Sequence, residues 1–198
     1  MSGDLTVRKG KIKPEKHDRL ILDLKLPNSG ISQLAFNDTR KFGKVWLTNQ
    51  PEKFLGKLGP EPLEKDFTSQ WLYENLRKRK RQIKPLLLDQ TFLAGVGNIY
   101  ADESLHIAKI HPQALSNVVT LKQAEALHEA IVSVLKEGIR RNGASIDWVY
   151  RGGEYQNYFR VYDHEDEPCM VCGTKIKKIV LGQRGTHFCP KCQKVERK

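Results

Sequence analysis

Four cysteines stand near the end of this 198-residue sequence as two Cys-x-x-Cys pairs. They are Cys169 with Cys172 and Cys189 with Cys192, and the chain has no others. Each pair can present two thiolates on one side of a tight knuckle, and two knuckles supply the tetrahedral sulfur shell that zinc prefers. We therefore predict one structural Zn²⁺ held by these four residues.

Two other roles for the cysteines fit the sequence less well. A thioredoxin-like redox site needs one such pair beside a βαβ pattern, and none is evident. Disulfides are typical of secreted chains, and the sequence shows no signal peptide. Because a closed shell of four thiolates has no open position, the metal is expected to fold a module and to take no part in chemistry.

The charge of the chain indicates what this module binds. The formal net charge is +11 and the isoelectric point is near 9.5, which favours a polyanionic partner such as nucleic acid. Six of the eight residues from Arg77 to Lys84 are basic, and residues 167–198 carry eight basic residues against two acidic ones. A charge run alone is usually a solvated helix face, but a run together with a basic zinc module indicates nucleic-acid binding.

Composition excludes a membrane protein. Mean hydropathy is −0.54 and no long apolar run is present, so we expect no membrane span. Reduced cysteines and the lack of a targeting or lipidation motif predict a cytoplasmic, nucleoid-associated location. We expect a monomer.

The first part of the chain, residues 1–62, has the pattern of β structure. Leucines alternate with other residues over 20–26, and the alternation resumes at 34–36 after a turn. A further strand is predicted over 44–48, and the Gly-Pro-Glu-Pro segment at 59–62 predicts a domain boundary. Strands with one long apolar face need other elements to cover that face. Either the helices of this chain or strands that would precede Met1 are expected to do so.

Residues 67–142 have a helical pattern. Thr120 and Gln123 form the capping-box spacing at the start of a long helix that Asn142 and Gly143 close. Two shorter helical stretches are expected at about 86–92 and 99–108.

The last part of the chain combines a loop with a hairpin. The Gly- and aromatic-rich residues 151–159 predict a surface loop, and strands near 178–181 and 186–189 predict a zinc hairpin.

The segment Gly95-Val96-Gly97-Asn98 joins the two shorter helical stretches. Its glycines permit close approach of the backbone to another surface, and a helix that begins at Asn98 offers free N–H groups to an anion. Lys84 adds a cation before the preceding helix. By itself the pattern favours an ordinary helix cap.

Longer motifs around this segment relate it to a known family signature. GVGNIYADE at 95–103, with LLLDQ at 86–90 and IHP at 110–112, resembles the helix–two-turn–helix signature of formamidopyrimidine-DNA glycosylases. QRGTHFCPKC at 183–192 resembles the zinc finger of that family, and DTRKFG at 38–43 and LGPEPL at 58–63 also match. The resemblance covers nearly the whole chain in the order of the family.

The resemblance implies an α+β multidomain fold. Part of an N-terminal antiparallel β-sandwich would occupy 1–62, and a helix–two-turn–helix all-α domain would occupy 63–150. A base-capping loop and connector would follow at 151–165, and a zinc-finger β-hairpin with four cysteine ligands at 166–198.

The resemblance also implies how the chain contacts DNA. Lys84 and Asn98 would grip phosphates flanking the lesion, with Tyr100 beside them, and Arg184 at the hairpin tip would enter the minor groove. Tyr162 would lie near the backbone contacts. Cations on phosphates supply affinity, as expected for a protein that extrudes a base.

A second group of residues would fill the gap that an extruded base leaves in the stack. The resemblance implies Met1, Arg40 and Phe42 for this role, with Arg40 facing the orphaned base and Phe42 wedging the step. The loop 151–159 would close over the flipped base.

The activity implied is that of a bifunctional DNA glycosylase and abasic-site lyase for oxidised purines, 8-oxoguanine and formamidopyrimidines. Its partner would be double-stranded DNA with oxidised bases or abasic sites. The family's nucleophile is an N-terminal proline beside a glutamate, and the sequence does not begin in this way. We therefore identify no catalytic residue and expect damaged-DNA binding with little base excision.

Two alternatives remain open. One is a non-catalytic, zinc-dependent protein that binds damaged or bent DNA without cutting it. The other, an RNA- or ribosome-associated zinc ribbon, explains the cysteines and the charge but not the Gly97-Asn98 hairpin or the pair of Arg40 and Phe42.

Overall fold

The computed structural model describes residues 3–26, 30–145 and 152–194, and these fall into two compact units. The sheet unit comprises residues 1–49 and 144–154, and the helix–finger unit comprises 50–143 and 155–198. The division after Asn49 precedes the boundary expected at 62. The reason is that main-chain hydrogen bonds join residues 59–60 to residues 90–94, from Gly59 N to Gln90 O and from Ala94 N to Pro60 O.

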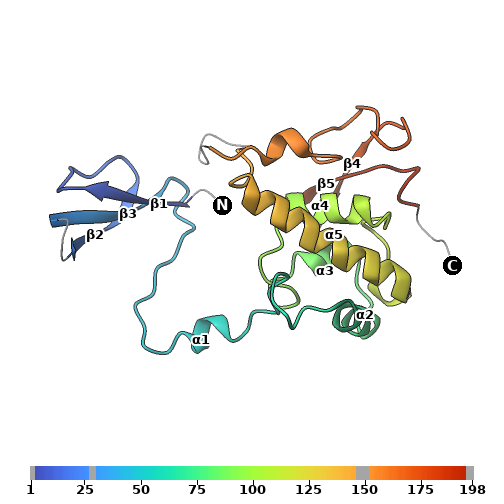
Figure 1. Ribbon diagram of the computed structural model, residues 1–198, viewed down its shortest axis with the longest axis horizontal. Helices are drawn as coiled ribbons and strands as arrows, with labels where there is room; N and C mark the ends of the chain where they lie inside the picture. The colour runs from blue at the N-terminus through green and yellow to red at the C-terminus, as the bar shows by residue number, and fades with distance from the viewer. Residues whose placement is uncertain (1–2, 27–29, 146–151, 195–198) are drawn as a thin grey trace. The chain divides into compact units, whose positions relative to one another are not determined.

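The sheet unit is a three-stranded antiparallel sheet (Figure 1). Its strands are β1 (Gly3–Lys9), β2 (Asp18–Leu26) and β3 (Gly30–Asp38), in the order β1-β3-β2. The strands predicted over 20–26 and 34–36 are confirmed. The strand predicted over 44–48 is wrong, because this segment pairs with no strand in the described part of the chain and its Leu47 is fully exposed.

The two faces of this sheet differ in character. One carries buried polar side chains, such as Gln33, which donates to Asp23 at 2.8 Å and accepts from the Ile12 N–H at 3.1 Å. The other carries apolar side chains, of which Leu5 and Val7 of β1 are well exposed. The period-two pattern therefore identified the apolar face correctly, and it is a face that water reaches.

Asp18 links three neighbouring residues at the polar face through hydrogen bonds. It accepts hydrogen bonds from Arg8 Nη1 at 2.7 Å, from Asn37 Nδ2 at 3.0 Å and from Glu15 N at 2.8 Å. The bonds from Arg8, then those from Asn37 and Glu15, hold the pKa of Asp18 well below its usual range.

A carboxyl whose pKa is depressed by folding stabilises the fold above its unfolded pKa, and the effect is lost as pH falls through the folded pKa. We expect Asp18→Asn to lower the urea midpoint of the sheet unit at pH 7. The difference from wild type should shrink as pH falls below about 4. Urea titrations followed by NMR signals of β3 measure this, and a pH-independent difference would contradict the assignment.

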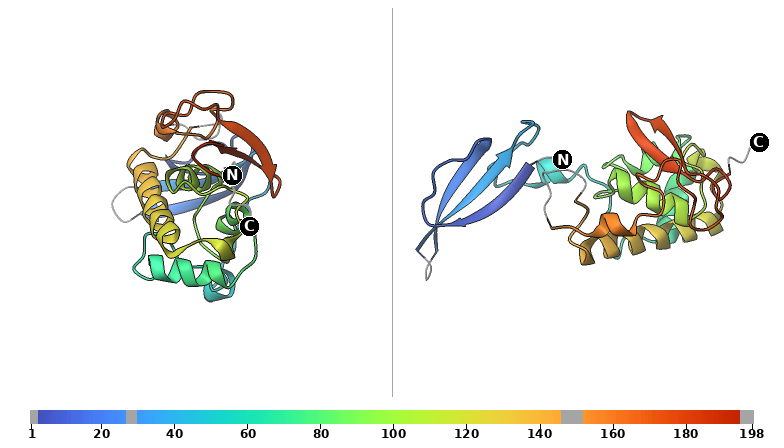
Figure 2. Two further views of the ribbon diagram at one scale, coloured as in Figure 1. Left: turned by 90° about the vertical axis from the view of Figure 1, so that its right-hand side faces the viewer. Right: turned by 90° about the horizontal axis from the view of Figure 1, so that it is seen from above.

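The helix–finger unit contains the remaining elements (Figures 1 and 2). They are α1 (Glu52–Leu55), α2 (Ser69–Arg77), α3 (Ile83–Leu87), α4 (Asn98–Ile107), η1 (Ser116–Val118), α5 (Leu121–Arg140), η2 (Tyr155–Tyr158), β4 (Lys177–Leu181) and β5 (Arg184–Phe188). The helix α5 packs against both α2 and α4, and β5 contacts α4. No helix in the described ranges is long and apolar enough to cross a membrane.

Local signals set the ends of α5 as predicted. Thr120 Oγ1 accepts from the Gln123 N–H, and Gln123 Oε1 accepts from the Thr120 N–H, which completes the capping box. At the other end, Asn142 and Gly143 take positive φ angles of 55° and 79°. The inner face of α5 contributes Leu127 and Ile131 to the core, both fully buried.

Two local predictions need correction. The helix expected at 86–92 lies at 83–87, because Asp89 accepts bonds from the Thr91 N–H and hydroxyl and so favours a turn. The region 151–159, expected to be a surface loop, contains η2. Tyr155 of η2 is buried with its ring stacked on Tyr100, at 5.4 Å between centroids.

Candidate metal centre and nucleic-acid interface

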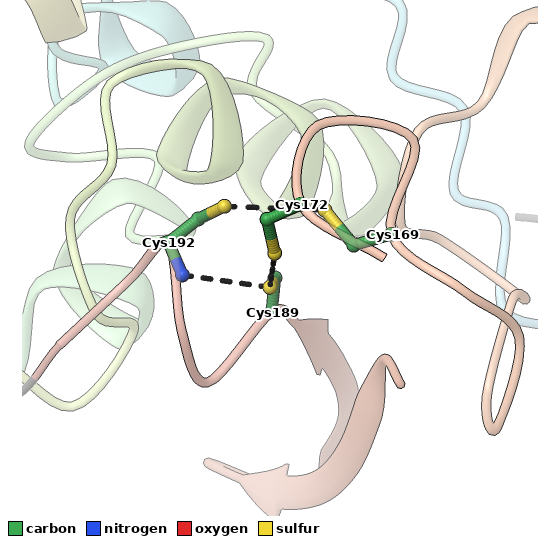
Figure 3. Close-up of side chains that lie close together, drawn as sticks. All are labelled: Cys169, Cys172, Cys189 and Cys192. Carbon is green, nitrogen blue, oxygen red and sulfur yellow. Dashed lines mark hydrogen bonds between the residues drawn. The ribbon is translucent and has the colours of Figure 1, made fainter. Parts of the chain in front are cut away.

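The four cysteines meet at one point (Figure 3). Their sulfurs lie within 4.8 Å of one another, with 4.0 Å between Cys169 and Cys192 and 3.5 Å between Cys172 and Cys189. A disulfide would need about 2.05 Å. Four thiolates about 2.3 Å from a zinc ion stand roughly 3.8 Å apart, so this donor set fits tetrahedral zinc.

Two buried side chains fasten the cysteine knuckles to the helical core. Gln193 accepts from the Cys189 N–H at 2.9 Å and donates to the Ile110 carbonyl at 2.9 Å. His106 of α4 places Nε2 3.5 Å from Cys169 Sγ, and burial lowers the pKa of this imidazole to about 4. A neutral imidazole can donate one N–H to a thiolate, which suits the outer shell of a metal site.

The finger hairpin presents Arg184 at its tip. Gly182 and Gln183 take positive φ angles of 53° and 62°, which form the tight two-residue turn between β4 and β5. Arg184 follows directly as the first residue of β5 and is exposed. A cation at this place is accessible to a phosphate backbone, and the contact of Arg184 with DNA stays a prediction.

Lys84 occupies a different place from the one predicted. Its side chain is fully buried, and Nζ lies 2.6 Å from Asp102 Oδ1, 2.8 Å from Thr186 Oγ1 and 2.9 Å from the Gly185 carbonyl. Burial lowers the pKa of Lys84, and the adjacent Asp102 carboxylate opposes this. The contact with phosphates expected for Lys84 does not fit this geometry, because the ammonium group lies inside the protein.

Two residues in the first turns of α4 form hydrogen bonds with β5. Asn98, at the start of the helix, donates from Nδ2 to the Gly185 carbonyl at 3.0 Å. Asp102, one turn later, accepts from the His187 N–H at 3.0 Å. The beginning of α4 and the hairpin tip are therefore adjacent, as Figure 2 shows for α4 and β5.

Glu103 anchors the segment that follows η2. Its buried carboxylate accepts three consecutive main-chain N–H groups, from Arg160, Val161 and Tyr162, at 2.9 to 3.0 Å. Burial raises the pKa of Glu103, and these three donors oppose the shift. Asp102 and Glu103 thus both hold other parts of the main chain by accepting hydrogen bonds from its N–H groups.

Tyr100 and Tyr162, both predicted to contact DNA, pack with their rings against other residues of the helix–finger unit. The Tyr100 hydroxyl lies so close to α5 that a Cβ at Gly138 would be 2.5 Å away, and its ring stacks on Tyr155. The Tyr162 ring meets Phe159 and His187 edge to face, at 5.4 Å and 5.0 Å between centroids. DNA contacts by Tyr100 and Tyr162 stay predictions.

The basic run at 77–84 is only partly a free charged surface. Arg77 and Arg79 donate to main-chain carbonyls, and Arg81 pairs with a carboxylate at 2.8 Å. Lys78 and Lys80 are exposed. The run therefore contributes less to an anion-binding surface than its composition suggested.

The predicted gap-filling residues lie in the sheet unit. The Asp38 carboxylate accepts from the Arg40 and Gly43 N–H groups at 3.2 Å and 2.7 Å and so shapes a turn after β3. On this turn the Arg40 guanidinium lies 5.6 Å from the centroid of Phe42, which is 75% exposed. Met1 lies outside the described residues.

Sequence reasoning missed the residues that assemble the site. Asp102, Thr186 and Gln193 carry no motif of their own, and each acts on a partner more than 80 residues away. The one signal in the sequence was the presence of charged residues within otherwise apolar segments. A lysine in the apolar run 83–87, and two acids in a helix otherwise facing the core, are costly unless paired.

The family described as "Formamidopyrimidine-DNA glycosylase H2TH domain" matches residues 58–149, and "Zinc finger found in FPG and IleRS" matches residues 166–195. The formamidopyrimidine-DNA glycosylases of Pelotomaculum thermopropionicum and of Synechocystis sp. are each 43% identical to this chain. The first alignment covers 99% of this chain and 72% of the relative, and the second covers 100% and 71%.

Solved structures give the same result. The Fpg of Lactococcus lactis in complex with abasic-site DNA matches with a TM-score of 0.86 and 39% identity over 98% of this chain and 72% of that one. MutM in complex with carbocyclic 8-oxo-G DNA matches with a TM-score of 0.86 and 40% identity over the same shares. The predicted α+β fold and the structural zinc ion of the four-cysteine finger are confirmed.

Proposed function

Since this chain belongs to the formamidopyrimidine-DNA glycosylase family, we propose that it acts in base-excision repair of oxidised purines, on duplex DNA that carries such a base or an abasic site. The similar solved structures hold abasic-site, 8-oxo-G or Fapy-dG DNA, which supports these substrates. We propose binding as a monomer to DNA of the nucleoid.

The observation that carries the proposal is the meeting of the hairpin tip with the start of α4. Asn98 donates to the Gly185 carbonyl, and the exposed Arg184 is the residue directly before Gly185 in the strand. A helix N-terminus and a cation presented together suit the phosphate backbone of DNA, whose contacts fix a protein on the duplex. We assign phosphate contacts to Asn98 and Arg184.

A separate role falls to Arg40 and Phe42. The exposed Phe42 ring, with the Arg40 guanidinium over it, offers an apolar wedge and a hydrogen-bond donor on one turn. Apolar wedges unstack a base step, and the cost of a few kcal/mol is lowest where a base is already damaged or missing. We assign the filling of the gap in the stack to these two residues.

The chemistry we propose is the one that the family resemblance implies, cleavage of the glycosidic bond followed by abasic-site lyase cleavage of the strand. We assign no residue of the given sequence to it and expect little base excision from these residues alone. A lyase that forms a Schiff base is trapped on abasic DNA by borohydride, so a covalent adduct at the mass of protein plus DNA would support the enzyme. Tight binding to abasic DNA without adduct or cleavage would favour the alternative, a protein that binds damaged DNA without cutting it.

Arg184→Ala is the direct test of the interface. Loss of one phosphate contact at distorted backbone should weaken binding to a duplex with an abasic-site analogue about tenfold, and binding to intact duplex only about twofold. Fluorescence anisotropy at fixed salt measures both affinities. Lys191→Ala, a matched loss of an exposed cation in the finger, is the control. Equal losses on both duplexes for Arg184→Ala would contradict its assigned place.

A further inference from the structure

We propose that Lys84 is a positioning residue for DNA binding, which acts through Arg184 and does not touch DNA. The inference rests on the proposed DNA-binding function. It concerns a buried cation in α3 that joins two parts of the interface, the start of α4 and the hairpin tip.

The geometry leaves Lys84 no means of contacting a phosphate. The Lys84 ammonium group donates hydrogen bonds to Thr186 Oγ1 at 2.8 Å and to the Gly185 carbonyl at 2.9 Å, and it forms an ion pair with Asp102 Oδ1 at 2.6 Å. The side chain is fully buried, as is that of Asp102. The ion pair and both hydrogen bonds thus lie inside the protein.

These contacts lead directly to the main chain of Arg184. Thr186 Oγ1 accepts from Lys84 Nζ and donates its own hydrogen to the Arg184 carbonyl at 3.1 Å. Gly185 is held from two sides, by Lys84 and by Asn98 of α4. His187, the residue after Thr186, is held through its N–H by Asp102. Three successive residues of β5 are therefore fastened to α3 and α4 immediately after the tip.

Stability alone does not account for such a network. A buried ion pair often contributes little net stability compared with apolar residues of the same volume, because both charges lose their hydration. What the network does provide is a fixed direction, since one ammonium group specifies the places of two hydrogen-bond acceptors and one carboxylate. A fixed Arg184 loses less freedom when it binds DNA, which raises affinity without any new contact.

The salt dependence of binding separates positioning from direct contact. A lysine on a phosphate displaces a counterion, so its removal lowers the slope of log affinity against log salt by about one. Lys84→Met should weaken binding to an abasic-analogue duplex about fivefold to tenfold and leave the slope unchanged. Arg184→Ala should lower the slope by about one. Lys80→Met, an exposed lysine of the same run, controls for loss of net charge.

A double-mutant cycle tests whether Lys84 acts through Arg184. The loss of affinity caused by Lys84→Met in the wild-type background should fall below about twofold in the Arg184→Ala background. Zinc content and thermal melting of each variant establish that the finger is folded. Thr186→Val provides a milder change that keeps the ion pair and removes the hydroxyl between Lys84 and Arg184. It should weaken abasic-duplex binding in the same direction, and also only when Arg184 is present.

The experiments distinguish a failure of this inference from a failure of the proposed function. An equal loss from Lys84→Met in both backgrounds, a slope reduced by one, or an unchanged affinity in folded Lys84→Met protein would overturn the inference. Should Lys84→Met fail to fold, unchanged binding by Thr186→Val would overturn it. A wild-type protein that does not prefer the abasic-analogue duplex to intact duplex would instead refute the proposed function.

Discussion

Removal of zinc should unfold the finger and abolish damage-specific DNA binding. Four thiolates lie within 4.8 Å of one another, and Cys169 and Cys189 are buried, so without a cation they must take up protons or separate. The binding free energy of a structural zinc ion is about 10–16 kcal/mol at neutral pH and is available only to the folded finger.

Cys189→Ser should have the same effect as a chelator, because Cys189 is fully buried and supplies one of the four sulfurs. We expect zinc content below one equivalent, loss of the hydrogen-exchange protection of β4 and β5, and at least a hundredfold loss of affinity for abasic-analogue duplex. A zinc assay measures the zinc content, hydrogen-exchange mass spectrometry the protection of β4 and β5, and fluorescence anisotropy the affinity for DNA. The affinity falls because β5 carries Arg184.

The matched control is Met170→Ser, which lies in the first knuckle but is 76% exposed and should change none of these properties. The helical part of the unit gives an internal control, since α2 and α5 pack on each other without the finger. If the chelator left both the melting curve and the exchange protection of β5 unchanged, the zinc would not hold the finger together.

Glu103→Ala should cost about 3–5 kcal/mol of the free energy of unfolding of the helix–finger unit, the second large effect. Three main-chain N–H groups at 160–162 would lose their acceptor in the interior, where water cannot replace it. Urea unfolding gives the energy. Hydrogen exchange at residues 160–162 should rise well before exchange in α5.

Two variants make this result specific. Glu103→Gln keeps the shape and one acceptor oxygen, so its loss should be about half that of alanine. Glu129→Ala removes a carboxylate from the exposed surface of α5 and should stay within about 0.5 kcal/mol of wild type. A Glu103→Ala protein as stable as Glu129→Ala would show that the three N–H groups find other partners.

The sequence by itself determined the features that depend on near neighbours in the chain. The spacing of Cys169, Cys172, Cys189 and Cys192 specifies a four-sulfur metal shell, because two tight knuckles leave little choice of geometry. The capping box at Thr120 and the strands beside the hairpin turn follow in the same way from local hydrogen bonding. The resemblance in motif order gave the family, which the comparisons confirm.

Only the tertiary structure decided what the isolated charges do. In sequence, Lys84 is one cation in a basic run, and only its place in the apolar run 83–87 distinguishes it from the exposed Lys80, without indicating which residues are its partners. Folding brings Lys84 against Asp102 and Thr186, 18 and 102 residues further along the chain, and that meeting makes it an interior residue. A buried charge must find partners, and partners at such separations are set by how the helices and the finger pack, which local sequence does not encode.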